Sequence, residues 1–227
     1  GLRNYEPKVH GAFAQSCCRG NLVYVALPII YSAYGEEGFA VAGIMIGFMT
    51  PLVNFCSILV LLLPQQRSDH QLGPSFWFNQ IALNPLIIAS FLGIAWSIFA
   101  LPIPLVLAET FDIISGMAMP LALMVIGASF SLAELRGDMV VTTLASVVKL
   151  VLLPVLAGAL LILFGVRGVE LGVGILLTGA PAASAGYILA QQLKSDGELT
   201  SSIIMVSTLA SVFSYTLCLY LLKIAGI

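Results

Sequence analysis

The stretch LLTGAPAASAGYILAQQ, residues 176–192, is apolar enough to enter a bilayer but contains residues that interrupt helices. Gly179 and Pro181 are unfavourable inside a helix, because proline lacks a backbone donor and glycine loses much conformational freedom on folding. An earlier stretch, GNLVYVALPII at residues 20–30, likewise places Pro28 inside an apolar run. The two stretches therefore predict membrane helices that are broken partway along their length.

The composition indicates an integral membrane protein. The 227 residues are 59% hydrophobic and 9% charged, with a mean hydropathy of +1.05. A soluble domain has about 25% charged residues. So few charges leave no basic surface for a nucleic acid, and no nucleic-acid partner is expected. The four cysteines follow no metal or disulfide spacing, so neither a metal nor a cofactor is expected.

The apolar runs are about twice as long as the ten residues that a transmembrane strand needs, which favours helices. Seven spans are predicted, at residues 11–34, 39–63, 84–100, 105–132, 140–164, 171–193 and 200–224. The loops between them are short. The sequence therefore predicts a single all-α transmembrane domain over residues 1–227.

The distribution of lysine and arginine predicts the orientation, because such residues are enriched in cytoplasmic loops. Of the nine basic residues, five are predicted on the side of the 64–75 loop: Arg3, Lys8, Arg67, Arg136 and Lys194. The opposite side carries Arg167 and Lys223. This bias predicts a cytoplasmic 64–75 loop and a C-terminus outside the cell.

The two proline-containing spans are followed by similar sequences. Each runs into a short acidic turn that contains glycine, YGEEG at 34–38 and SDGEL at 195–199, and then into a long uninterrupted span. Counting spans places the two units in opposite orientations. This pattern predicts inverted repeats whose broken helices cross near the midplane. Helix N-termini and exposed backbone donors at such a crossing suit an anion.

Four segments together resemble the auxin efflux carrier family of membrane transporters. They are RGNLVYVALPIIYSAYGEEG at 19–38, PLALMVIGASFSL at 120–132, KLVLLPVL at 149–156 and GAPAASAGYILAQQLKSDGELTSSIIMVSTLASV at 179–212. The resemblance extends from about Phe13 to Leu222. The family includes plant auxin carriers and bacterial members similar to dicarboxylate or malonate carriers, and the resemblance implies a bacterial-type member.

The resemblance implies two inverted repeats of five helices, an architecture like that of sodium/bile-acid symporters, with the fourth and ninth helices broken at a proline. Residues 11–63 would then be the remainder of the first repeat, and residues 84–224 the complete second repeat. Three N-terminal helices are expected to be missing from this chain. The implied location is a bacterial inner membrane.

The resemblance also implies substrate-binding residues. Plant carriers place an asparagine near the substrate carboxylate, seven residues before the first crossover proline, which corresponds here to Asn21 and Pro28. The second crossover proline corresponds to Pro181. After it, polar side chains at helical spacing are predicted to line one face of the second half-helix: Ser184, Tyr187 and Gln191. Interhelical hydrogen bonding and close packing of small residues are the alternative roles for these positions.

Four charged residues are candidates for substrate attraction or coupling. Arg19 and Lys149 lie within predicted spans, where burial of a charge costs about 2.5–3.5 kcal/mol. Arg19 either attracts an anion or extends to the membrane edge. Lys149 either pairs with Glu109 or Asp112 or takes the place of a coupling cation. Glu109 and Asp112 share a helix face, where they either exchange a coupling proton or complement the helix dipole.

The sequence therefore predicts a secondary active transporter of small organic anions, such as dicarboxylates or auxin-like carboxylates, that works by alternating access. The expected partners are the anion, the lipid bilayer and a coupling proton or sodium ion; a homodimer is also considered. A sodium- or proton-coupled antiporter or symporter of the same architecture is the alternative. An intramembrane enzyme is a remote alternative, because the sequence shows no catalytic histidine, aspartate pair or Ser–Lys pair within a span.

Overall fold

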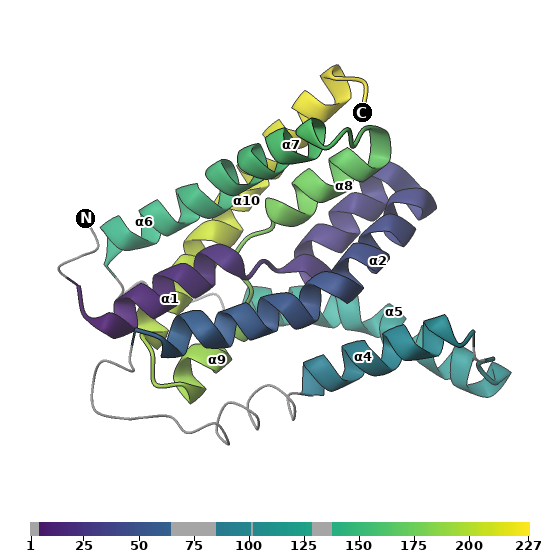
Figure 1. Ribbon diagram of the computed structural model, residues 1–227, viewed down its shortest axis with the longest axis horizontal. Coiled ribbons are helices and arrows are strands. Elements are labelled where there is room, and N and C mark those ends of the chain that lie inside the picture. Colours follow the sequence, from purple (N-terminus) through teal and green to yellow (C-terminus); the bar gives the residue numbers. More distant parts are fainter. Residues whose placement is uncertain (1–4, 65–84, 101, 129–137) are drawn as a thin grey trace.

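The computed structural model describes residues 5–64, 85–100, 102–128 and 138–227, and these residues form helices (Figure 1). The predicted 64–75 loop lies almost entirely outside the described residues. In chain order the elements are α1 (Pro7–Cys18), η2 (Leu22–Ala26), α2 (Leu27–Leu62), α4 (Pro85–Ile98), α5 (Leu105–Ala128), α6 (Met139–Val147), η5 (Val148–Leu152), α7 (Leu153–Leu163), α8 (Gly168–Thr178), α9 (Ala185–Gln192) and α10 (Gly197–Ile224). The elements η2 and η5 are single π-helical turns. The prediction of an all-helical protein is confirmed.

The helices follow the predicted apolar runs. Helix α2 turns sharply at Gly35, whose φ of 61° favours glycine, and so separates the first two predicted spans. Elements α6, η5 and α7 form one continuous apolar helix. By length and composition, three helices in the described part of the chain could cross a membrane, at Leu22–Leu62, Met139–Leu163 and Gly197–Ile224.

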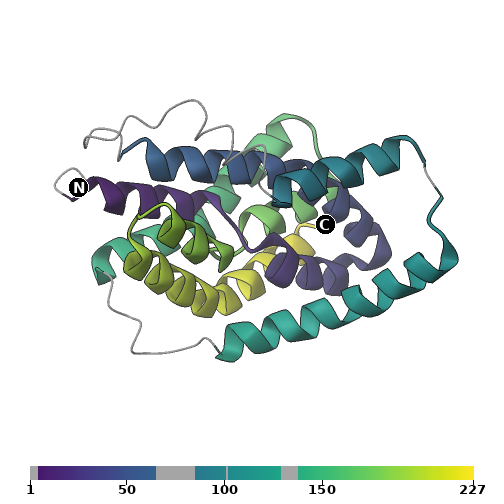
Figure 2. The same cartoon turned by 90° about the horizontal axis from the view of Figure 1, so that it is seen from below.

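Adjacent helices pack in layers. Helices α7, α8, α2 and α4 follow one another in Figure 1, and α5 runs along an edge of the molecule in Figure 2. One buried apolar cluster joins η2, α2, α8 and α10, and a second joins α1, α6 and α10. A third cluster joins α2 to α9. The clusters involve the helices on both sides of the breaks described below, and so fix the positions of the broken ends.

The predicted break at Pro28 is wrong. Helix α1 ends at Cys18 and the chain becomes helical again at Leu22, so Pro28 lies in the first turn of α2. Proline is tolerated in a first helical turn. The π turn before it also shifts the hydrogen-bond register, since the Leu27 N–H donates to the Leu22 carbonyl five residues earlier. The first break instead lies at residues 19–21.

Asp138 caps the N-terminus of α6 outside the apolar part of the helix. Its Oδ1 accepts hydrogen bonds from the N–H groups of Val140, at 2.8 Å, and Val141, at 3.2 Å, while Oδ2 accepts from the Tyr5 hydroxyl at 2.7 Å. The Tyr5 hydroxyl and then these N–H groups hold the pKa of the Asp138 carboxyl below its ordinary value. The carboxylate therefore stabilises the fold at neutral pH.

Replacement of Asp138 by alanine should lower the midpoint of thermal unfolding at pH 7 by about 2–4 °C, because α6 loses its cap. The pKa of the Asp138 carboxyl is lower in the folded protein than its unfolded value of about 3.9. The stabilisation is therefore fully present above about pH 3.9 and is lost as the pH falls through the folded pKa. The difference between the two proteins should therefore shrink at acidic pH. Thermal unfolding of both proteins in detergent at several pH values measures this difference. Equal midpoints at pH 7 would contradict the proposed capping role of Asp138.

Candidate functional site

Two interruptions in the helices lie against each other. The first interruption, residues 19–21, separates α1 from η2, and the second interruption, residues 179–184, separates α8 from α9. Gly20 and Ala182 form an isolated antiparallel β-bridge. Two segments that are about 160 residues apart in the sequence therefore meet in an extended conformation inside a helical bundle.

The backbones of the interruptions satisfy each other's hydrogen bonds. The Asn21 N–H donates to the Pro181 carbonyl at 2.7 Å, and the Ala183 N–H donates to the Arg19 carbonyl at 3.0 Å. Backbone groups that a helix break leaves unpaired are costly in an apolar environment. The pairing explains how the two breaks can coexist at this depth in the bundle.

Gly20 allows the close approach of the two interruptions. A Cβ atom at this position would lie 3.1 Å from the Ala180 Cβ and 3.2 Å from the Lys149 Nζ. Both distances are shorter than ordinary van der Waals contact. The absence of a side chain at residue 20 therefore keeps the second interruption and the lysine close to the first.

Asn21 is held in place by its own side chain. The residue is 6% exposed, and its Oδ1 accepts a hydrogen bond from the Tyr24 N–H at 3.3 Å, which caps η2. Its backbone N–H contacts the second interruption. The structure therefore places Asn21 at the contact between the interruptions, whereas Pro28, the proline paired with it in the sequence, lies in α2.

Arg19 has a partner that sequence reasoning missed. Its guanidinium Nη1 donates a hydrogen bond to Oδ1 of Asn54, which lies buried on α2. The Asn54 amide nitrogen has no hydrogen-bond partner among the described residues. An asparagine in the middle of an apolar span is itself a signal of a polar contact, and it could have identified Asn54.

Lys149 is 3% exposed and lies in η5. Its Nζ donates a hydrogen bond at 3.1 Å to the carbonyl of Thr178, the last residue of α8. Carbonyls at a helix C-terminus lack partners within the helix and attract cations. Glu109 and Asp112 are exposed on α5. The predicted pairing of Lys149 with one of these acids therefore gains no support, because the lysine instead contacts the start of the second interruption.

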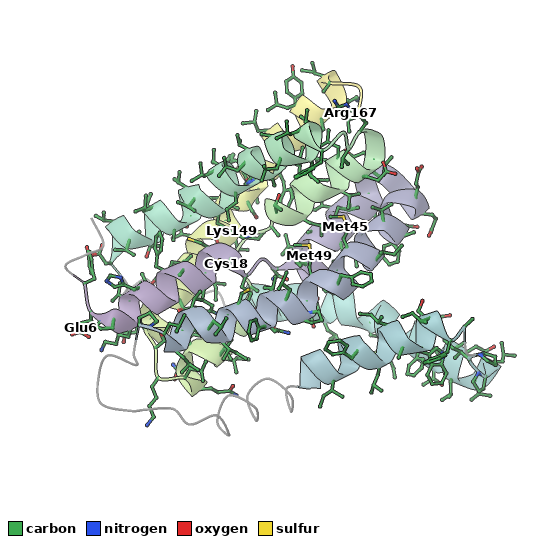
Figure 3. All side chains as sticks on the ribbon, in the orientation of Figure 1. Glu6, Cys18, Met45, Met49, Lys149 and Arg167 are labelled. Atoms are coloured by element: carbon green, nitrogen blue, oxygen red, sulfur yellow. The ribbon has the colours of Figure 1, made fainter. Side chains whose placement is uncertain are left out.

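A pocket of about 320 Å³ lies beside the contact between the interruptions. Its wall comes from the ends of the broken helices and from α2, η5 and α7, and includes Cys18, Met49, Lys149, Leu153, Leu160 and Thr178. Figure 3 shows the labelled Cys18, Met49 and Lys149 near the middle of the molecule. The pocket thus combines a buried amine with a largely apolar wall.

Three predicted site residues lie on α9 or directly before it, away from this pocket. Ser184, Tyr187 and Gln191 are exposed, and the Gln191 Nε2 donates a hydrogen bond to the Tyr187 hydroxyl at 2.9 Å. They share one side of the second half-helix, and they are not among the residues that line the pocket. The structure therefore brings together Asn21, Pro181 and the basic residues, but leaves these three side chains on an outer surface.

Long apolar helices and two interrupted helices in contact are features of membrane transporters. The chain belongs to the membrane transport protein family, whose model matches residues 2–219 and which is the auxin efflux carrier family that the sequence resembles.

Two relatives support this assignment. The chain is 27% identical over 197 residues to an "Uncharacterized transporter" of Methanothermobacter thermautotrophicus, covering 87% of this chain and 63% of the relative. It is 31% identical over 146 residues to a "Putative malonate transporter" of Rhizobium meliloti, covering 64% of this chain and 46% of the relative. The chain thus matches less than two thirds of the length of either relative.

Proposed function

We propose that this chain forms part of a secondary active transporter of small organic anions, which moves them by alternating access around the paired interruptions. The observation that carries the proposal is the backbone pairing of the first and second interruptions. Helix breaks in a bilayer are tolerated where the freed backbone groups find partners, and the pairing supplies such partners for two breaks at one place. Binding of a substrate between half-helices is the established use of such breaks.

The charges near the contact support an anion as the substrate. Arg19 belongs to the first interruption, and the Lys149 Nζ lies close to Gly20. The pocket wall contains no carboxylate among the described residues. Asn21, at the contact between the interruptions, supplies a polar side chain between Gly20 and Leu22, which line the pocket. In this proposal the Asn21 side-chain amide binds the substrate carboxylate, because the backbone N–H groups of Asn21 and Ala183 are engaged in the pairing. Pro181 keeps the second interruption from becoming helical.

The transport cycle follows from this arrangement. The bundle rocks around the bound anion, and the pocket becomes accessible from each side of the membrane in turn. Ser184, Tyr187 and Gln191, which lie on the outer side of the second half-helix, are proposed to contact the anion on its way to or from the pocket. Export of an anion from a cell with a negative interior is favoured by the membrane potential, and a proton or sodium ion is the alternative drive.

The relative described as a malonate transporter adds support for a carboxylate substrate. We further propose a bacterial inner membrane as the location, with the C-terminus outside. The inverted repeats and the sodium/bile-acid symporter-like architecture remain part of this proposal. In this account Glu109 and Asp112 are exposed acids that carry a coupling proton.

Transport by the purified full-length protein in liposomes tests the proposal. Labelled mono- and dicarboxylates, malonate included, are offered under a pH gradient, a sodium gradient and an imposed membrane potential in separate experiments. The expected result is saturable uptake of at least one carboxylate, driven by one of these gradients. Absence of carboxylate movement under every gradient would overturn the proposal, and recovery of a chemically altered substrate would favour the intramembrane enzyme.

A further inference from the structure

We infer that Lys149 is the charged anchor of the pocket and that it selects a substrate with one carboxylate on an apolar body. This inference rests on the proposed function, and it goes further by naming the residue and the substrate class. It assigns to Lys149 direct contact with the substrate, whereas the sequence alone left open a structural pairing or a coupling role. The hydrogen bonds of the ammonium group are the first reason.

The Lys149 ammonium has N–H donors that are not used in hydrogen bonds among the described residues. A lysine carries three N–H donors, and within the described part of the chain its Nζ contacts one acceptor, the Thr178 carbonyl at 3.1 Å. Burial of a charged group with incomplete hydrogen bonding is costly. The same residue lines the pocket of about 320 Å³, so an anion there would satisfy the remaining donors. A carboxylate is the group whose charge and acceptors match.

The rest of the wall is apolar. On the side of α7 the pocket is lined by Leu153, Leu156, Ala157 and Leu160, and Met49 lines it from α2. A carboxylate next to these side chains would lose its hydration without gaining a partner. Since Lys149 is the one charged side chain in the wall among the described residues, the pocket accommodates one carboxylate and disfavours a second.

The position of Lys149 would place a bound substrate next to the broken helices. Lys149 donates to the last residue of α8, where the second interruption begins, and its Nζ lies close to Gly20 of the first interruption. An anion bound to this ammonium would therefore lie beside both interruptions. The pocket volume is at the lower end of the range for small-molecule sites, about 300–1,000 Å³, and fits a body of about one ring.

Three probes that share one ring test the inference on the full-length protein. They are cyclohexanecarboxylate, trans-cyclohexane-1,4-dicarboxylate and the neutral cyclohexanecarboxamide. Binding is measured by thermal stabilisation of the purified protein and by competition with carboxylate uptake into liposomes. The proteins compared are the wild type, Lys149→Met, Lys149→Arg and the control Lys223→Met, which removes an exposed lysine near the C-terminus.

The expected result is that the wild type binds the monocarboxylate about tenfold or more tightly than either other probe. Lys149→Met should weaken monocarboxylate binding by about 30-fold or more, and should remove the preference over the carboxamide. Lys149→Arg should retain part of that preference, and Lys223→Met should behave as the wild type.

Equal or tighter binding of the dicarboxylate by the wild type would overturn the inference, as would an unchanged preference in Lys149→Met. Because the three probes are also compared on the unmodified protein, the inference can be refuted even where a variant fails to fold. Transport of malonate without binding of the monocarboxylate would refute the inference and leave the proposed function intact. Failure to bind or move any carboxylate would refute both.

Discussion

Replacement of Gly20 by valine should abolish most transport and destabilise the protein by about 1–3 kcal/mol. A Cβ at this position already lies 3.1 Å from the Ala180 Cβ and 3.2 Å from the Lys149 Nζ, and valine adds two further methyl groups. The second interruption must shift by a few tenths of an ångström to accept the added atoms, and two backbone hydrogen bonds hold it to the first interruption. We therefore expect initial transport rates to fall by about tenfold or more, beyond any loss of expression.

Gly43→Val is the matched control, because Gly43 is exposed on α2 and a Cβ there would meet no atom within 4 Å. Its transport rate and melting temperature should remain near those of the wild type. Rates are measured in liposomes and normalised to the folded protein found by size-exclusion chromatography. Wild-type transport by Gly20→Val would show that close contact at residue 20 is not needed.

Replacement of Asn21 by aspartate should reduce kcat/KM for anion transport by about 30-fold or more, measured per folded protein because the buried charge also lowers stability. Aspartate keeps the side-chain oxygen that accepts the Tyr24 N–H bond, so the cap of η2 is preserved. It also places a negative charge at a site proposed to bind a carboxylate, and repulsion between buried like charges costs several kcal/mol. The change thus separates a binding role from a structural one.

Asn21→Ser serves as the control, since its hydroxyl can also accept the cap hydrogen bond but carries no charge. It should lose less transport than Asn21→Asp. Asn21→Ser should have a melting temperature close to that of the wild type, whereas Asn21→Asp should melt at a lower temperature because it buries a new charge, so transport is normalised to the folded protein. If Asn21→Asp transports carboxylates at the normal rate, the side chain does not face the substrate, and its role is restricted to capping.

Apolar runs and glycines in the sequence predicted the fold better than prolines did. Long apolar runs and the glycine in YGEEG correctly indicated membrane helices and the sharp turn at Gly35. The break at Pro28 was mispredicted because the effect of a proline depends on the backbone hydrogen bonds of the turn that precedes it. Here that turn is a π turn, and Pro28 lies in the first turn of the α-helix that follows. Gly20 and Asn21, residues common at helix ends, were the better signal for the first interruption.

The candidate site was less predictable than the fold, because its contacts join distant parts of the chain. The hydrogen bond from Lys149 to Thr178 connects residues from two helices, and nothing in the local sequence favours it over a pairing with an acid. Asn54 was missed although it interrupts an apolar span. In contrast, Asn21 was singled out through a family resemblance, and the structure places it at the contact between the interruptions.

The most direct test of the central claim, that the two interruptions meet, is a disulfide between cysteines placed at Gly20 and Ala182. The bridge geometry makes them a non-hydrogen-bonded antiparallel pair, for which Cα atoms lie about 4.5 Å apart and a disulfide can form. The native cysteines are first replaced, and the full-length protein is oxidised in native membranes. We predict nearly complete cross-linking at 20 and 182, reversed by reductant, and none between cysteines at 43 and 182. The double-cysteine protein is first checked for a melting temperature near that of the wild type, because a Cβ at residue 20 is crowded by Ala180 and Lys149, although cysteine adds one atom fewer than valine. Failure of the first pair to cross-link in the folded protein, or equal cross-linking of both pairs, would contradict the account.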